Sequence, residues 1–95
     1  MKFDDVILDY DEQLGGVQGV VEYGPYELSI VSHKYSYGGD KGLFEIAVFK
    51  GDEQVELPGV THKGDTVKGF LSESEVNGIM VKMYSLTGEE GVQQT

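Results

Sequence analysis

The 95-residue sequence contains neither cysteine nor arginine, and it has no long hydrophobic run. Without cysteine, the chain can form neither a disulfide framework nor a thiolate metal site, so its stability must come from packing. Without arginine, it lacks the guanidinium forks and the basic stripe with which proteins bind phosphate groups. Because no apolar stretch approaches the length of a membrane span, we expect no contact with a membrane.

The amino terminus shows no secretory signal, because carboxylates follow Phe3 at once and no apolar core region comes after them. We therefore expect a cytoplasmic protein. A chain of this length supports one modest core, and we predict a single globular domain over residues 1–86. Residues 87–95 are acidic and rich in glycine and glutamine, and they are predicted to form a flexible tail.

Candidate catalytic and metal-binding groups are sparse. The two histidines, His33 and His62, fall in predicted loops and belong to no nucleophile or zinc-helix motif. The segment from Asp9 superficially matches a calcium loop, but Leu14 stands where that loop needs glycine, and Val20 where it needs a bidentate glutamate. Since the sequence offers no nucleophile–base pair, we expect a protein that is not an enzyme and that carries no metal or cofactor.

Two segments, Tyr26–Ser32 and Leu43–Phe49, form the predicted centre of the fold. In both, apolar and polar residues alternate with the period of a half-buried strand, and aromatic or β-branched residues dominate. The glycine-rich connection between them predicts an antiparallel pair. The core face of this pair is then Tyr26, Leu28, Ile30, Phe44, Ile46 and Val48, and its wet face carries Glu27, Ser29 and Glu45.

Further strands are predicted before and after this pair in the sequence, at Val6–Leu8, Val17–Tyr23, Gln54–Leu57 and Thr66–Phe70. The polar stretch that begins at Asp9 is predicted to be a turn. Gly19, inside the second of these strands, indicates a bulge or a close approach of backbone.

A helix from about Glu73 to Tyr84 has the clearest local signal in the chain. Ser72 and Glu75 fit a capping box, in which each residue satisfies a free amide of the first turn. An apolar stripe with helical spacing follows: Val76, Ile79, Met80 and Met83. Gly78 interrupts the helix and suggests close backbone packing there. The predicted fold is α+β, a small antiparallel sheet of about four to five strands with one C-terminal helix packed on it.

Charge is the extreme property of the chain. Seventeen Asp and Glu against seven Lys give a formal net charge of −10. Such a protein is repelled by nucleic acids and anionic lipid, and it attracts basic partners. Carboxylates on alternate residues of a strand recur about every 6.7 Å, which is similar to the spacing of successive phosphates on one nucleic-acid strand. An acidic sheet face could therefore imitate a row of phosphates and occupy the DNA groove of a basic protein.

The predicted partner-binding residues are the carboxylates on or beside the sheet, extended by those at the amino terminus and at the start of the helix. They are Asp4, Asp5, Asp9, Asp11, Glu12, Glu22, Glu27, Glu45, Asp52, Glu53, Glu56, Glu73 and Glu75. The expected partner is a basic DNA-binding protein, such as a nucleoid-associated protein, with no direct binding of nucleic acid. A homodimer would cover more of that partner.

The segment Ser36-Tyr37-Gly38-Gly39, the strand that follows Gly42, and Thr66–Leu71 with the capped helix together resemble small acidic phage proteins. The resemblance covers residues 26–84. It implies a host-takeover factor that mimics DNA to inhibit a nucleoid, transcription or defence protein, and that acts in a bacterial host cytoplasm.

The alternative interpretation is an interaction module whose acidity serves only solubility. In that case a partner is bound by the loop that carries Tyr35 and Tyr37, because interfaces concentrate tyrosine, or by the edge of the sheet at 54–57. The structural interpretation of the two tyrosines is a long hairpin whose rings fold back over the edge of the sheet, and it is the one we favour because exposed aromatic loops are common in small domains.

Overall fold

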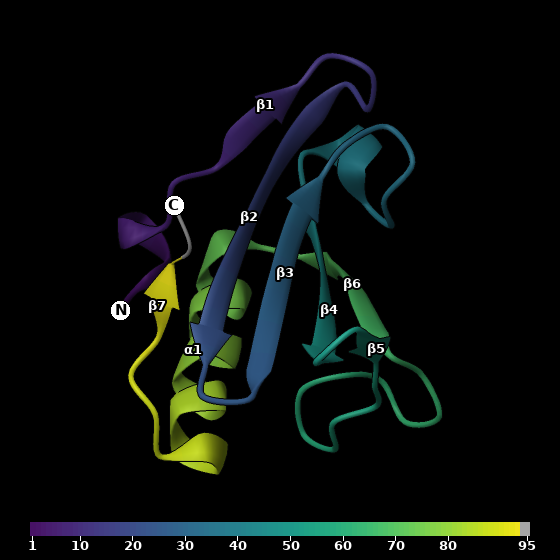
Figure 1. The fold of residues 1–95 in the computed structure, drawn as a ribbon. Helices are drawn as coiled ribbons and strands as arrows, with labels where there is room; N and C mark the ends of the chain where they lie inside the picture. Colours follow the sequence, from purple (N-terminus) through teal and green to yellow (C-terminus); the bar gives the residue numbers. More distant parts are fainter. Residues whose placement is uncertain (94–95) are drawn as a thin grey trace.

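The computed structural model describes residues 1–93, which form an antiparallel sheet with one α-helix packed against it (Figure 1). Seven strands make up the sheet: β1 Asp9–Asp11, β2 Gly16–Tyr23, β3 Tyr26–Ser32, β4 Phe44–Lys50, β5 Glu53–Gln54, β6 Val67–Leu71 and β7 Val92–Gln93. The helices are two 3-10 turns, η1 Phe3–Asp5 and η2 Gly39–Lys41, and the α-helix α1 Glu73–Thr87.

Three long strands, β2, β3 and β4, form the centre of the sheet as a meander. Each outer edge consists of two short strands rather than one. β1 and β7 pair with opposite ends of β2, and β6 and β5 pair with opposite ends of β4. The predicted α+β class is confirmed, whereas the sheet has seven strands instead of four or five because of these divided edges.

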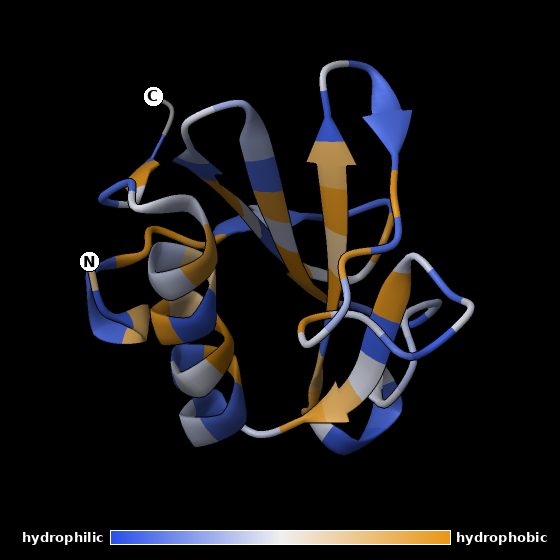
Figure 2. Ribbon diagram, turned by 90° about the horizontal axis from the view of Figure 1, so that it is seen from below, coloured by the Kyte–Doolittle hydropathy of each residue, from blue (hydrophilic) through white to orange (hydrophobic). Residues whose placement is uncertain are grey.

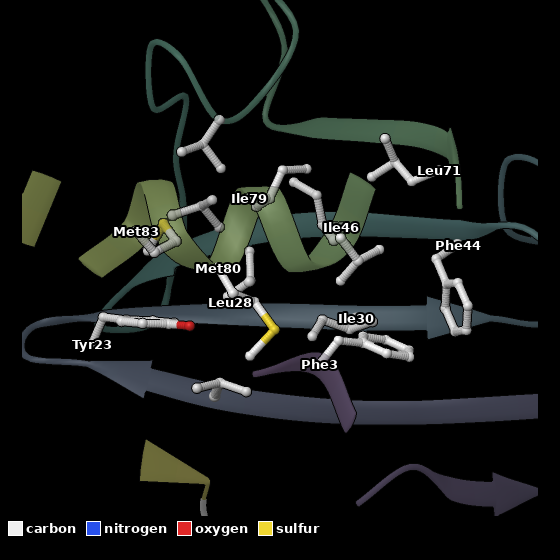
Figure 3. Packing of buried hydrophobic residues seen from close by; sticks show 14 residues of the cluster. Phe3, Tyr23, Leu28, Ile30, Phe44, Ile46, Leu71, Ile79, Met80 and Met83 are labelled. Carbon is white, nitrogen blue, oxygen red and sulfur yellow. The ribbon is translucent and has the colours of Figure 1, made fainter. Parts of the chain in front are cut away.

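The core lies between α1 and one face of the sheet. The predicted core residues of β3 and β4 point toward the helix, and all of them are buried except Tyr26, which is half-buried. The predicted stripe of α1 is buried against them, and Figure 3 shows Met80 and Met83 among the strand residues. Phe3 of η1 packs edge-on against Phe44, with ring centroids 5.2 Å apart. Figure 2 shows α1 on one side of the sheet and hydrophobic residues along β4.

Helix α1 begins as predicted and ends three residues later than predicted. The amide of Glu75 donates to the Ser72 hydroxyl at 3.1 Å, and the Ser72 amide donates to the Glu75 carboxylate at 3.0 Å, so both halves of the capping box are present. Gly88 caps the end of the helix after Thr87, and its φ of 69° is the left-handed conformation that glycine adopts readily. The prediction of close packing at Gly78 is wrong, because apart from its chain neighbours and the backbone of its own helix no described atom lies within 4 Å of a Cβ built there.

The amino-terminal strand lies later than predicted. Residues 6–8 are not a strand, and β1 occupies Asp9–Asp11, where a turn was expected. The Gln93 side chain forms hydrogen bonds to both backbone groups of Ile7. It accepts from the Ile7 amide at 2.7 Å and donates to the Ile7 carbonyl at 2.6 Å. This segment crosses Gly19 so closely that a Cβ there would lie 3.0 Å from the Ile7 carbonyl oxygen, as the close approach predicted at Gly19 requires.

The chain after the helix differs from the predicted flexible tail. Val92–Gln93 forms β7 and pairs with Val21 and Glu22 of β2, which places this segment against the sheet. Residues 94 and 95, the end of the predicted tail, lie outside the described residues. On the other edge, β5 is shorter than the predicted strand 54–57, because the Leu57 amide donates to the Thr61 hydroxyl instead of to the sheet.

Candidate functional site

The sheet face turned away from α1, together with its rim at Asp9, Asp11 and Asp52, carries the largest group of predicted site residues. We call it the open face, and Figure 1 shows it in front of the helix at β2 and β3. Its residues alternate with the core residues of the three central strands: Gln18, Val20, Glu22, Glu27, Ser29, Val31, Glu45, Ala47 and Phe49. All of these except the exposed Gln18 are partly buried, so the face is only partly open to solvent.

The strand register arranges the open face into three rows that run across the sheet. One outer row is Asp9, Gln18, Val31 and Glu45; the middle row is Val20, Ser29, Ala47 and Val67; the other outer row is Val92, Glu22, Glu27, Phe49 and Gln54. Carboxylates stand only in the outer rows. Since these rows are four residues apart along β2, they lie about 13 Å from one another.

Two shallow hollows lie over the open face and its β1 edge, and they share Gln18 and Val20. The first, of about 440 Å³, is bordered by Asp9 and Asp11. The second, of about 340 Å³, reaches Phe49 and is bordered by Glu27 and Asp52. Because the two hollows share lining residues, they form one depression with carboxylates at each end and a mixture of polar and apolar side chains, Gln18, Val20 and Ser29, between them.

The carboxylates of the open face and its rim differ in their neighbours and hydrogen bonds. Glu22 and Glu27 are directly opposite each other on β2 and β3, an arrangement of like charges that destabilises a sheet. Glu45 accepts a hydrogen bond from the Tyr37 amide at 3.0 Å, which ties this face to the loop before β4. Asp11 accepts from the amides of two residues of its turn, so its carboxylate also has a structural role.

The other predicted carboxylates lie elsewhere. Asp4, Asp5, Glu73 and Glu75 surround the start of α1 and η1, Glu12 is in the β1–β2 turn, and Glu53 and Glu56 are in and after β5. Several of these stabilise local structure: Asp5 accepts from the Lys2 amide, Glu56 accepts from the Gly64 amide at 2.6 Å, and Glu75 caps α1. The predicted set is therefore divided among separate parts of the fold, and only part of it shares the open face.

The Glu75 carboxyl has a pKa below its ordinary value of 4.5. The hydrogen bond from the Ser72 backbone is the main cause, followed by that from the Ser72 side chain, and the positive charge of Lys68 contributes further. Glu75 is thus held ionised by its capping role.

A second surface consists of Tyr37, Phe70 and Lys41, which we call the aromatic platform. The two rings are stacked with centroids 6.4 Å apart, and the Lys41 ammonium lies 5.8 Å from the Phe70 centroid. Tyr37 is 60 % exposed and Phe70 54 % exposed, so both rings present apolar surface to solvent. The loop around Tyr37 is fixed by the bond from the Phe70 amide to the Tyr37 carbonyl at 3.1 Å.

Phe70 has a φ of 58°, in the left-handed region that bulky residues rarely adopt. The register of β6 against β4 shifts at this point, which places Gly69 and Phe70 in a bulge. A Cβ on Gly69 would lie 2.4 Å from the Tyr37 Cβ, so the loop packs directly on this glycine. From the sequence, Tyr37 was proposed as a contact residue but Phe70 and Lys41 were missed. The available signal was Gly69, because a glycine inside a predicted strand often marks a bulge.

Among residues 1–93, no three His, Asp or Glu side chains are grouped so that they could hold a metal ion. No helix in that range is long and apolar enough to cross a membrane.

No protein-family model matches the chain, and no curated protein and no solved structure is significantly similar to it. The resemblance to small acidic phage proteins therefore stays a prediction.

Proposed function

We propose that the protein binds the basic DNA-binding surface of another protein through its open face and so keeps that surface from DNA. The observation that carries the proposal is the arrangement of two carboxylate-bearing rows on either side of a row without carboxylates. This arrangement fits a partner that presents lysine or arginine around an apolar centre. The net charge of −10 attracts such a partner over long distance and speeds the encounter.

The dimensions agree with imitation of DNA. The outer rows are about 13 Å apart by the rise of a strand, and the major groove of DNA is about 12 Å wide between its phosphate borders. The molecule measures 33 × 30 × 26 Å, and one turn of DNA is about 34 Å long. A homodimer would offer two such faces, and that assembly remains a prediction.

Glu22 and Glu27 lie directly opposite each other, so a basic partner on the open face would meet two carboxylates at one point of their outer row. The apolar residues between the rows supply the area that such a partner would bury on binding.

The test uses purified bacterial nucleoid-associated proteins as probes and measures binding of the labelled full-length protein by fluorescence anisotropy. We expect binding to at least one of them to weaken steeply with added salt and to be competed by duplex DNA. A triple variant of the open face, Asp9→Asn, Glu27→Gln and Asp52→Asn, should weaken this binding at least tenfold.

The matched control removes three charges away from the open face, by Asp4→Asn, Glu73→Gln and Glu89→Gln. It has the same net charge as the first triple variant and should bind within about threefold of wild type, because only long-range attraction is reduced. Equal losses in both variants would mean that total charge alone matters. Binding that DNA leaves unchanged would contradict the imitation of DNA.

A second candidate function is a protein-interaction module that uses the aromatic platform and the exposed Tyr35 of the same loop. It is favoured by the strained backbone of Phe70, because such strain persists where the surrounding structure enforces it and is concentrated at functional sites. Under this hypothesis Tyr35→Ala with Tyr37→Ala abolishes partner binding, and the open-face triple variant does not. Such binding would be insensitive to salt.

A further inference from the structure

A third hollow, separate from the open face and from the aromatic platform, lies between α1 and the chain that leads to β7. We call it the Tyr23 hollow. Its volume is about 200 Å³, and its lining includes Tyr23, Met80, Val81, Tyr84, Glu90 and Gly91. For comparison, an engineered apolar cavity of about 150 Å³ is large enough to hold benzene. The Tyr23 hollow therefore has room for a molecule of roughly that size.

Tyr23 supplies a polar group that has no partner. Its side chain is 1 % exposed, and its hydroxyl is the buried side-chain atom that makes no hydrogen bond to any described residue. Burying a hydroxyl without a partner is costly, so native proteins nearly always satisfy such groups. Figure 3 shows the hydroxyl pointing toward Met80, which lines the same hollow. A methionine side chain is flexible and can move to admit a ligand to this atom.

The surroundings select the chemistry of the ligand. Methionine, valine and tyrosine side chains favour an apolar body. The pKa of Tyr23 is raised to about 12 by burial and by the nearby Glu90 carboxylate, so its hydroxyl keeps its proton and can donate it in a hydrogen bond. At the mouth of the hollow the Glu90 carboxylate pairs with the Met1 ammonium at 3.6 Å, so the two charges offset each other and favour neither an anionic nor a cationic ligand. The ligand atom that faces Tyr23 is therefore a neutral acceptor, such as a carbonyl oxygen.

We propose that the Tyr23 hollow binds a small neutral apolar molecule whose oxygen accepts a hydrogen bond from the Tyr23 hydroxyl. This inference is independent of the proposed function, because the hollow shares no lining residue with the open face. The hollow has one apolar wall on α1 and one polar donor on β2, which is the usual composition of a small-molecule site.

The experiment uses two probes of the same shape, cyclohexanone, which has a carbonyl oxygen, and methylenecyclohexane, which has a CH₂ group in its place. Each is titrated into the full-length protein with ¹³C-labelled methionine and valine methyl groups. We expect saturable shifts of the Met80 and Val81 methyl signals and no such shift at Val31 on the open face. Tyr23→Phe should weaken cyclohexanone binding about fivefold, the value of one neutral hydrogen bond, and leave methylenecyclohexane unchanged.

A second variant keeps the test informative if Tyr23→Phe does not fold. Val81 is 61 % exposed on α1, so Val81→Trp can fill the hollow without disturbing the core, and it should abolish binding of both probes. The absence of any saturable shift in the wild type would overturn the proposal and leave a buried water as the partner of Tyr23. Equal effects of Tyr23→Phe on the two probes would overturn the hydrogen bond.

Discussion

Ser72 and Glu75 fix the residue at which α1 begins. Each side chain accepts a hydrogen bond from the other residue's amide, so two amides that the helix cannot satisfy internally have partners. Their effect is local, because both are at the surface, and it needs no other part of the chain. This independence explains why the start of the helix could be predicted from the sequence alone.

Replacement of Ser72 by Ala should lower the free energy of unfolding by about 1 kcal/mol, because the Glu75 amide loses its acceptor. Ser74→Ala, two residues further along the exposed first turn, serves as the control and should be near neutral. Urea denaturation monitored by circular dichroism measures both changes. A loss no larger for Ser72→Ala than for Ser74→Ala would contradict the capping role.

The same cap predicts that folding stability depends on pH in the acidic range. The pKa of Glu75 is lowered in the folded state, so its ionised form adds stability that is present above pH 4.5 and lost as the pH falls below that value. The difference in stability between wild type and Glu75→Gln should therefore be constant near pH 7 and shrink below pH 4.5. Denaturation curves at a series of pH values would measure it, and a difference that grows in acid would contradict the assignment.

The raised pKa of Tyr23 predicts a loss of folding stability at alkaline pH. Its pKa is 10.0 in its ordinary state and about 12 in the fold, so the unfolded chain loses this proton first. The stability that depends on it is complete below pH 10 and is lost as the pH rises through 12, a decrease on the order of 2 kcal/mol. Tyr23→Phe should remove this decrease in alkaline denaturation measurements. An identical alkaline loss in both proteins would show that other tyrosines cause it.

At the scale of elements, alanine substitutions at two glycines should have opposite effects on stability, one through helix propensity and the other through packing. Gly78 lies in α1, and no other element of the described chain comes within 4 Å of a Cβ built there, so Gly78→Ala should raise the free energy of unfolding by about 1 kcal/mol. Gly69 lies in β6 against Tyr37, and Gly69→Ala should destabilise the protein because its Cβ has no space. Thermal unfolding of the two variants measures both changes in stability. Changes of the same sign would contradict this packing.

The elements differ in how far the sequence predicted them. β2, β3, β4 and α1 were predicted within one to three residues, because each buries one face of a regular pattern. β6 was also predicted within one residue, as Thr66–Phe70, whereas the edge strands β1, β5 and β7 depend on their neighbours. Residues 6–8 have an apolar pattern yet form no ladder, because the Gln93 side chain satisfies the backbone of Ile7. No local signal contains that contact, since it joins residues from opposite ends of the chain.

At the scale of the whole molecule, the position of the carboxylates matters more than their number. Glu27 faces Glu22 across the sheet, whereas Glu53 faces Lys50. Glu27→Gln and Glu53→Gln change the net charge equally, so any difference between them reports arrangement. We expect Glu27→Gln to stabilise the protein by about 0.5 kcal/mol at low salt and Glu53→Gln to be neutral or destabilising. The stabilising effect should shrink as salt screens the pair.

Chemical denaturation at 10 mM and at 0.5 M NaCl would measure these two variants. Equal stabilisation by both would mean that the repulsion is spread over the molecule and that the open face has no special arrangement. Glu27→Gln should at the same time weaken partner binding, since stability and binding are expected to oppose each other at this residue.

The sequence by itself determined the α+β class, the central strands, the capped helix and the net charge of −10, because alternation, helical spacing and composition are properties of neighbouring residues or of simple sums. Only the tertiary structure decided which carboxylates share the open face, which of them are used in caps and turns, and how Phe70 joins Tyr37. It alone placed the unpartnered Tyr23 hydroxyl beside a hollow. These features depend on strand register and on contacts between distant residues, which the geometry of the folded chain fixes and local patterns do not encode.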